Sequence, residues 1–353
     1  MTNSPKVRDV AVAMSGGVDS FVAAALLIRQ GYRVTGLHAL LHAEKAPEGL
    51  DLARQAAQRL SIALHVVDLR VEFRTLVVEP FVAAYLAGRT PNPCFTCNPL
   101  IKFGLLAERA REELCGAGLL ATGHYARIGK TAGGEISLLR AADHAKDQSY
   151  FLALVPRDRL RDLLFPLGDL TKAAVREMAQ KTLGLRDGLP RESQDVCFLA
   201  GGDYRALLAG GEDRPGDIVD LDGRVLGRHQ GLWRFTVGQR RGIGVAAPRP
   251  LYVRALDVAG NRLVVAAAGQ APFGFMTVGR VNQLCAAEEE LHSCRAVRTR
   301  YRQREQGCTV STLPDGRLRV EFAEPQQAVS VGQGAVFHQG ERVLAGGIIE
   351  EAG

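Results

Sequence analysis

Long apolar runs are missing from this sequence of 353 residues, in which no stretch of roughly 18 or more consecutive apolar residues occurs. Residues 1–9 are polar and lack the apolar centre of a secretory signal. A membrane-spanning helix is therefore not expected, nor a membrane partner. The default expectation is a cytoplasmic protein.

A disulfide framework is also not expected. The chain has seven cysteines, an odd number in a large chain that we expect in the cytoplasm. Four of them belong to no recognisable motif, and we interpret them as ordinary small residues: Cys115, Cys285, Cys294 and Cys308.

The composition that remains is that of a globular protein, with 46% hydrophobic and 23% charged residues. The net charge is +6 and the cations are mostly arginines, which suit forked contacts to phosphate. Charge alone fits a polyanion-binding protein and a merely basic surface equally well.

The first half alternates strand-like and helix-like segments. Apolar runs at 10–14, 34–41, 64–68 and 119–122 predict strands, and residues 21–30, 50–60 and 101–114 predict helices. This rhythm predicts an α/β domain with a mostly parallel sheet, in which ligands bind at the carboxyl ends of the strands.

The pattern changes near residue 200. Short alternating segments separated by Gly and Pro predict antiparallel strands at 250–258, 261–267, 295–303, 318–322 and 334–338. We expect a catalytic domain over 1–205, a small β-rich domain over 206–272 and a C-terminal β-barrel over 273–353.

The strongest motif is Ser15-Gly16-Gly17-Val18-Asp19-Ser20, between a predicted strand and a predicted helix. Two glycines allow a close backbone approach, and amides at a helix N-terminus attract anions. Asp19 fits if Mg²⁺ is bound as well, or if it caps the helix. The plainer interpretation is a glycine turn before a capped helix.

This loop resembles that of the PP-loop ATP pyrophosphatase superfamily. The resemblance implies an adenine nucleotide alpha hydrolase-like fold, and an enzyme that uses ATP to transfer AMP to a substrate oxygen. The loop alone does not name the substrate, because synthetases of asparagine, GMP and NAD share it.

Three cysteines lie where chemistry is plausible. Cys94 and Cys97 form a C-x-x-C pair within the proline-rich segment 88–98, which predicts a shaped loop. Cys197 lies in the segment 191–198. Each alone fits a structural role, but an adenylated carbonyl carbon needs a nucleophile, and sulfur is a good one.

At this point the sequence closely resembles the tRNA-specific 2-thiouridylase family. The matching stretches follow the family's order along almost the whole chain: 14–20, 88–98, 101–103, 121–126, 146–152, 193–198, 235–240, 300–303 and 332–337.

The resemblance implies conversion of the wobble uridine of tRNA to 2-thiouridine, with Cys97 as nucleophile and Cys197 as carrier of persulfide sulfur. The residues it places at ATP are Ala13, Met14, Ser15, Gly16, Gly17, Val18, Asp19, Ser20, Ala39 and Gly123. Those it places at the target base or elsewhere on tRNA are Asn92, Pro93, Cys94, His124, Lys146, Asp147, Gln148, Arg300, Tyr301 and Gln333.

The sequence departs from the family pattern at three positions. Ala13 replaces a usual Gly, Ala39 replaces a usual Met, and Cys94 stands where many members carry Asp. The third cysteine leaves two routes for sulfur open. Sulfur travels either as a persulfide on Cys197, or on a [4Fe–4S] cluster held by the three cysteines, a route slightly favoured by Cys94. Zinc is a weaker third ligand of such thiolates. A sulfur-donor protein or a sulfide source is needed in either case.

The arginines of the C-terminal part alternate with other residues from position 298: Arg298, Arg300, Arg302 and Arg304. On a strand they would line one face and follow the tRNA phosphates. The alternative is a solvated edge strand.

Two other functions stay open. One is a PP-loop synthetase acting on a small molecule, which would need neither the cysteine pair nor the basic stripe. The other is an RNA-binding module that holds ATP without turnover.

Overall fold

The computed structural model describes residues 8–42, 46–113, 118–183, 197–198, 207 and 213–353. The chain forms two compact units. The first comprises Met1–Val77, Cys94–Phe198 and Gly340–Val343, and the second Val78–Pro93, Leu199–Gln339 and Leu344–Gly353. No helix within the described residues is long and apolar enough to cross a membrane.

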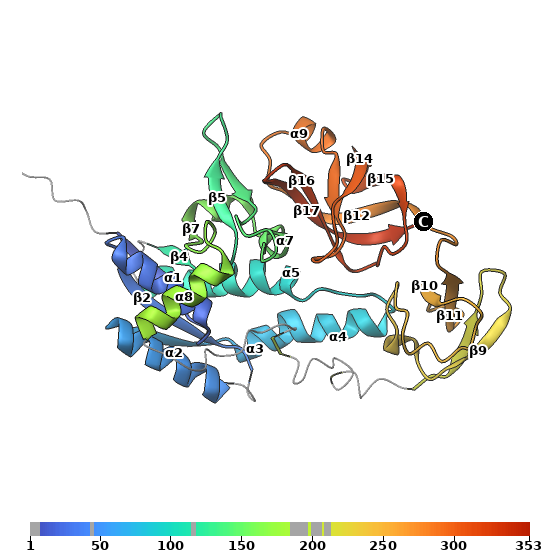
Figure 1. Ribbon diagram of the computed structural model, residues 1–353, viewed down its shortest axis with the longest axis horizontal. Coiled ribbons are helices and arrows are strands. Elements are labelled where there is room, and N and C mark those ends of the chain that lie inside the picture. Colours follow the sequence, from blue (N-terminus) through green and yellow to red (C-terminus); the bar gives the residue numbers. More distant parts are fainter. Residues whose placement is uncertain (1–7, 43–45, 114–117, 184–196, 199–206, 208–212) are drawn as a thin grey trace, which may run out of the picture. The chain divides into compact units, whose positions relative to one another are not determined.

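A parallel sheet organises the first unit, with the strand order β3-β2-β1-β4-β7. Figure 1 labels β2, β4 and β7 of this sheet. The strands are β1 (Asp9–Ala13), β2 (Arg33–Leu40), β3 (Leu64–Asp68), β4 (Leu119–Ala121) and β7 (Leu163–Leu164). Every neighbouring pair is parallel. The predicted α/β class with a parallel sheet is confirmed. The carboxyl ends of β1 and β4 are neighbours, so the segments that follow them meet at one edge of the sheet.

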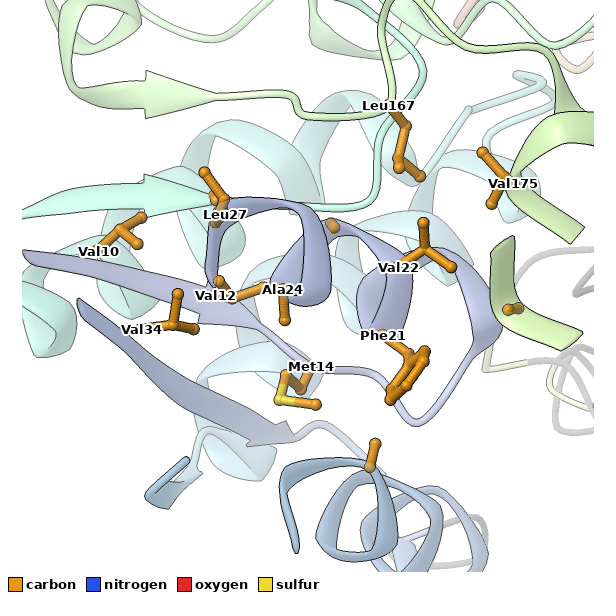
Figure 2. Packing of buried hydrophobic residues seen from close by; sticks show 14 of the residues in the cluster. Val10, Val12, Met14, Phe21, Val22, Ala24, Leu27, Val34, Leu167 and Val175 are labelled. Atoms are coloured by element: carbon orange, nitrogen blue, oxygen red, sulfur yellow. The ribbon is translucent and has the colours of Figure 1, made fainter. Parts of the chain in front are cut away.

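The core of this unit lies between β1 and α1 (Val18–Arg29). Val10 and Val12 of β1 pack against Phe21, Val22 and other apolar residues of α1, all at most 2% exposed (Figure 2). Small and aliphatic side chains let the helix approach the sheet closely. Truncation of a buried Phe to Ala typically lowers the free energy of unfolding by about 3–5 kcal/mol. Because α1 is held against β1 by such packing, the loop that joins them is also held in place.

Other helices and a hairpin complete the first unit. The longer helices are α2 (Ala46–Leu60), η2 (a π-helix, Asn98–Leu105), α6 (Leu106–Glu113) and α8 (Lys172–Leu183). The shorter elements are α3 (Arg70–Phe73), η1 (Arg74–Val78), α5 (Cys94–Cys97), α7 (Ser149–Leu152), η3 (Arg157–Asp162) and the β5–β6 hairpin (Arg127–Lys130 and Ile136–Leu139).

The second unit contains α4 (Glu79–Leu86) and a four-stranded sheet with the order β10-β11-β8-β9. Its strands are β8 (Gly216–Val219), β9 (Val225–His229), β10 (Leu251–Asp257) and β11 (Arg262–Ala267), with η6 (Leu232–Arg234) between β9 and β10. The expectation of purely antiparallel strands is wrong for one pair. Two antiparallel hairpins lie side by side through β8 and β11, and these two strands are parallel.

The predicted C-terminal β-barrel is confirmed. Six strands follow the order β12-β15-β14-β13-β16-β17, and pairing of β12 with β17 closes the ring. They are β12 (Phe273–Gln283), β13 (Ala296–Arg298), β14 (Gln306–Thr312), β15 (Leu318–Gln326), β16 (Gly334–Gln339) and β17 (Arg342–Ala352), with α9 (Glu288–His292) after β12. Cys285, Cys294 and Cys308 are buried in the barrel core, while Cys115 lies outside the described residues.

Candidate active site

The loop between β1 and α1 has the geometry of an anion cradle. Gly16 has a φ of +83°, and a Cβ there would lie 2.5 Å from the carbonyl oxygen of Gly49. Both facts require glycine. The Ser20 hydroxyl donates to the Gly17 carbonyl at 2.9 Å, and the Gly17 N–H donates to Ser15 Oγ at 3.3 Å. The two serines therefore hold the shape of the loop, at the N-terminus of α1 where an anion is stabilised.

A buried histidine fixes the entry to this loop. His38 Nδ1 lies 2.7 Å from the Met14 carbonyl oxygen, which can only accept a hydrogen bond. Burial lowers the pKa of His38, which favours the neutral ring with its proton on Nδ1. Ala39 follows His38 in β2, and Ala13 is the last residue of β1. The predicted ATP residues thus lie at the carboxyl ends of two paired strands.

Asp19 is held by two residues that the sequence did not reveal. The Lys172 ammonium lies 2.6 and 2.8 Å from the two Asp19 carboxylate oxygens, and the Tyr125 hydroxyl donates to Oδ1 at 3.0 Å. The helix-cap interpretation of Asp19 is wrong, because Gly17 is the cap residue and no side chain caps the helix. Tyr125 lies in one of the matching stretches, but no motif marks Lys172.

The cysteine pair lies on one helical turn. Cys94 begins and Cys97 ends α5, so the expected loop is wrong at these residues. Burial raises the pKa of both thiols, to about 12 for Cys97, while the nearby Lys102 ammonium partly opposes the rise. The negative charge of the Cys197 thiolate also raises both pKa values. Cys197, which is exposed, therefore lies near the pair.

Packing against α7 positions α5 and the start of η2. The Asn98 amide donates to the Phe151 carbonyl at 2.8 Å, and the Phe95 and Tyr150 rings meet edge to face with centroids 5.0 Å apart. Because these contacts involve buried groups, they hold the C-x-x-C turn in a defined place.

His124 follows β4 in an aromatic cluster. Its Nδ1 lies 2.7 Å from the Thr122 hydroxyl, and its ring centroid lies 5.8 Å from that of Phe103 and 6.1 Å from that of Phe165. Burial, with a smaller contribution from Lys102, lowers the pKa of His124 well below its usual value. The ring is therefore neutral at physiological pH.

The predicted tRNA residues of the first unit also include Lys146, Asp147 and Gln148. Asp147 is buried, and its carboxylate accepts hydrogen bonds from the Ala141 N–H and from both the N–H and the hydroxyl of Ser149. Gln148 Oε1 accepts from the Tyr125 N–H at 2.9 Å. The bond between Gln148 and Tyr125 joins the 146–148 turn to the segment after β4. Lys146, in the same turn, is half-buried.

The second unit holds Asn92, Pro93, Arg300, Tyr301 and Gln333. The Arg300 guanidinium donates to the Val237 carbonyl at 2.6 Å and to Ser330 Oγ at 2.5 Å. Tyr301 and Gln333 are half-buried, and the Gln333 N–H donates to the Ser330 carbonyl at 3.2 Å.

The prediction of an arginine stripe along a strand is wrong. The strand β13 ends at Arg298, whose guanidinium donates to the Tyr301 and Gln303 carbonyls and so closes a turn. Arg302 and Arg304 are exposed on the segment that follows, and Arg300 is half-buried.

A metal ion such as zinc in this unit would need several His, Cys, Asp or Glu side chains close together. Within the described part of the chain, no three His, Cys, Asp or Glu side chains are arranged to hold a metal ion. The described residues therefore form no site for a single metal ion such as zinc.

A parallel α/β sheet with this glycine loop defines a nucleotide-binding protein of the PP-loop class. Three family models match the chain in sequence: "tRNA methyl transferase HUP domain" over 8–201, "tRNA methyl transferase PRC-barrel domain" over 207–267 and "Aminomethyltransferase beta-barrel domain" over 274–349.

Curated relatives name the family more closely. The tRNA-specific 2-thiouridylase MnmA of Syntrophotalea carbinolica is 44% identical, over 98% of this chain and 99% of its own. Those of Geobacter metallireducens and a Synechococcus species are 42% and 45% identical, over 100% and 97% of this chain and 99% and 97% of their own. The chain therefore belongs to the tRNA-specific 2-thiouridylase family.

Proposed function

We propose that this protein is an ATP-dependent sulfurtransferase that converts the wobble uridine of tRNA to 2-thiouridine. The observation that carries the proposal is the nearness of Cys197 to the Cys94–Cys97 turn. These three cysteines belong to the same unit as the loop Ser15–Ser20, which we call the phosphate loop. An adenylating loop and a group of sulfur nucleophiles are the two parts that thiolation of a carbonyl carbon requires.

Adenylation is the first step. The amides of Ser15–Ser20 and the N-terminus of α1 would hold the ATP phosphates, and the Asp19 carboxylate would hold Mg²⁺, which would offset the negative charge of the phosphates. The O2 oxygen of the uridine attacks the α-phosphate, and pyrophosphate leaves. The product carries AMP on O2, so that C2 becomes open to attack by a nucleophile.

Sulfur transfer follows by the persulfide route. A donor protein that carries a persulfide transfers its outer sulfur atom to the thiolate of Cys197, which is exposed, and the donor leaves as a thiol. The terminal sulfur attacks C2, and AMP leaves with the oxygen. The Cys97 thiol then gives up its proton and attacks the Cys197 sulfur, which releases the thiocarbonyl. A Cys97–Cys197 disulfide forms, and an external dithiol reduces it.

No step of this proposal passes through an iron–sulfur cluster or zinc, because an exposed cysteine can carry persulfide sulfur without either group. Iron analysis of anaerobically purified protein, with absorbance near 400 nm, tests this part. If activity rises in proportion to the iron content, a cluster route would replace the persulfide route in this proposal. The proposed substrate and product would stay the same.

The tRNA substrate would contact both units through the residues that the family resemblance indicates. The wobble base leaves its anticodon stack to reach the sulfur-bearing cysteines, as bases do in other modifying enzymes. Exposed arginines such as Arg302 and Arg304 would contact the tRNA phosphates. A cytoplasmic location is part of this proposal.

The test is incubation with Mg·ATP, a persulfide donor, a dithiol and unmodified tRNA. Nucleoside mass spectrometry should show 2-thiouridine, with one AMP formed per thiolated base. Cys97→Ser and Cys197→Ser should abolish 2-thiouridine. Cys285→Ser is the matched control, since Cys285 lies in the barrel core and its thiol donates to the Ala287 carbonyl, a bond that serine can keep.

A methylated uridine formed from a methyl donor, without 2-thiouridine, would contradict the proposal. This outcome is worth a separate reaction, because two of the matching family models carry the words methyl transferase in their names.

A further inference from the structure

Lys172 is a buried cation next to the phosphate loop, although it lies 153 residues from Asp19 in sequence. It begins α8, and its N–H donates to the Asp143 carboxylate at 3.0 Å. Its side chain is 9% exposed, and its ammonium binds both oxygens of Asp19, whose side chain is 34% exposed. The ammonium also lies 5.4 Å from the centre of the Tyr125 ring.

Stability alone explains this placement poorly. A cation in the first turn of a helix is repelled by the helix dipole, and α8 begins with this one. Removal of an ammonium from water is also costly, and an ion pair with a partly solvated carboxylate recovers little of that cost. The arrangement is explained more simply if a second anion comes to this place.

That anion would arrive at the loop. Asp19 is the second residue of α1, two positions after Gly17, and Gly16 and Gly17 form the glycine cradle that precedes the helix. Gly123 packs directly against the Asp19 backbone and so fixes the point from which the Asp19 side chain extends. A ligand phosphate in the cradle would therefore lie close to the Asp19–Lys172 pair.

We propose that Lys172 is the cation that neutralises the phosphates of ATP during adenylation, and that Asp19 holds it in place before ATP binds. When Mg·ATP enters, Mg²⁺ takes the Asp19 carboxylate and the Lys172 ammonium moves to a phosphate oxygen. Lysine suits this exchange because its ammonium is a compact charge on a flexible stem. This inference rests on the proposed function, whose adenylation step it deepens.

The experiment compares Lys172→Met and Lys172→Arg with the unchanged protein. Equilibrium binding of Mg·ATP is measured without tRNA, and the rate of AMP formation is measured with tRNA. Thermal melts give the fraction of folded protein, and both results are expressed per mole of folded protein. Loss of one preorganised charge typically lowers a rate by about 100-fold or more, so we expect K172M to lose about 100-fold in AMP formation. We expect at least about 10-fold weaker ATP binding from the same variant, and K172R to keep part of both.

Lys181→Met is the matched control, because Lys181 is an exposed lysine on the same helix that pairs with Glu177. It should bind ATP and form AMP like the unchanged protein. Asp19→Asn separates the two roles. It should raise the Mg²⁺ concentration needed for half-maximal AMP formation, whereas K172M should leave that concentration within about 2-fold.

Unchanged ATP binding and AMP formation in folded K172M would overturn the inference and show a merely structural ion pair. Should K172M fail to fold, Lys172→Gln, which keeps a hydrogen-bond donor for Asp19, carries the same test. If the unchanged protein makes no 2-thiouridine but its ATP binding depends on Lys172, the proposed function fails and the assignment of Lys172 stands.

Discussion

The backbone of Gly123 lies directly against that of Asp19. A Cβ at position 123 would lie 2.8 Å from the carbonyl carbon of Asp19 and 2.9 Å from both its Cβ and the Ser20 nitrogen. Atoms of the backbone cannot move aside as a flexible side chain can. The segment after β4 therefore sets the position of the phosphate loop, and glycine is required there for its lack of a side chain.

Gly123→Ala should displace the phosphate loop. We expect a loss of about 1–3 kcal/mol in the free energy of unfolding, as for other overpacked sites, and at least about 10-fold weaker binding of Mg·ATP. Urea denaturation and equilibrium binding measure the two effects. Gly133→Ala is the control, because a Cβ there meets only Thr131 Oγ1 at 3.7 Å. Equal ATP affinity for the two variants would contradict the close approach.

Cys97 and Cys197 should react with iodoacetamide at very different rates. Burial raises the pKa of the Cys97 thiol to about 12, so at pH 8 only roughly one molecule in 10,000 carries the thiolate. Cys197 is exposed. Peptide mass spectrometry over time should find Cys197 modified first, while Cys97 stays unmodified. Comparable rates would indicate that the C-x-x-C turn is open to solvent.

The same raised pKa makes stability depend on pH. The unfolded chain loses the Cys97 proton near pH 9, whereas the folded protein keeps it up to about pH 12. The folded state thus binds more protons in this window, so the free energy of unfolding falls as the pH rises above 9. Urea denaturation at pH 8 and pH 10 should show a smaller fall for Cys97→Ser. An identical fall in both proteins would refute the assignment.

Lys102 should control the reactivity of the cysteine pair. Its ammonium lowers the pKa of the Cys94 and Cys97 thiols against the effect of burial. Lys102→Met should raise both pKa values further and slow 2-thiouridine formation by about 10-fold or more, with partial recovery at higher pH. Lys102→Arg should keep most of the rate.

Lys130→Met provides the control for a lost lysine charge, because Lys130 is exposed at the end of β5. The measurement is the initial rate of thiolation between pH 7 and pH 9. A rate that does not depend on Lys102 at any pH would eliminate its electrostatic role.

Local sequence patterns were sufficient to predict the parallel sheet of the first unit. The alternation of apolar segments along the first half predicted the parallel sheet, and the glycine pair after β1 predicted the turn between β1 and α1, because both signals lie within a few residues. The Asp19–Lys172 pair was not predictable in this way. Its members are 153 residues apart, and only the packing of α8 in the tertiary structure brings them together.

Proline misled the prediction for the cysteine pair. Pro93 and Pro99 indicated a loop, yet Pro93 directly precedes α5, and Pro99 lies in the first turn of η2. Proline is tolerated at such positions because the N–H groups of a first helical turn need no partner within the helix. The arginines from 298 onward misled in a similar way, since alternation alone does not show where a strand ends.

Arg300 and Arg302 should differ in what their replacement disturbs. Arg300 donates to the Val237 carbonyl and to Ser330, so Arg300→Gln should lower the free energy of unfolding by about 1–3 kcal/mol. Arg302 is exposed, so Arg302→Gln should leave the melting temperature unchanged. If Arg302 contacts a phosphate, its loss should weaken tRNA binding and reduce the slope of log affinity against log salt by about one.

Both variants are compared by thermal melting and by tRNA binding at several salt concentrations, with ATP binding as a check on the first unit. A contact with phosphate through Arg302 requires that ATP affinity stays unchanged while the salt slope falls. If Arg302→Gln binds tRNA with the unchanged affinity and slope, the exposed segment after β13 takes no part in binding. The tRNA phosphates would then have to be held by other cations of the chain.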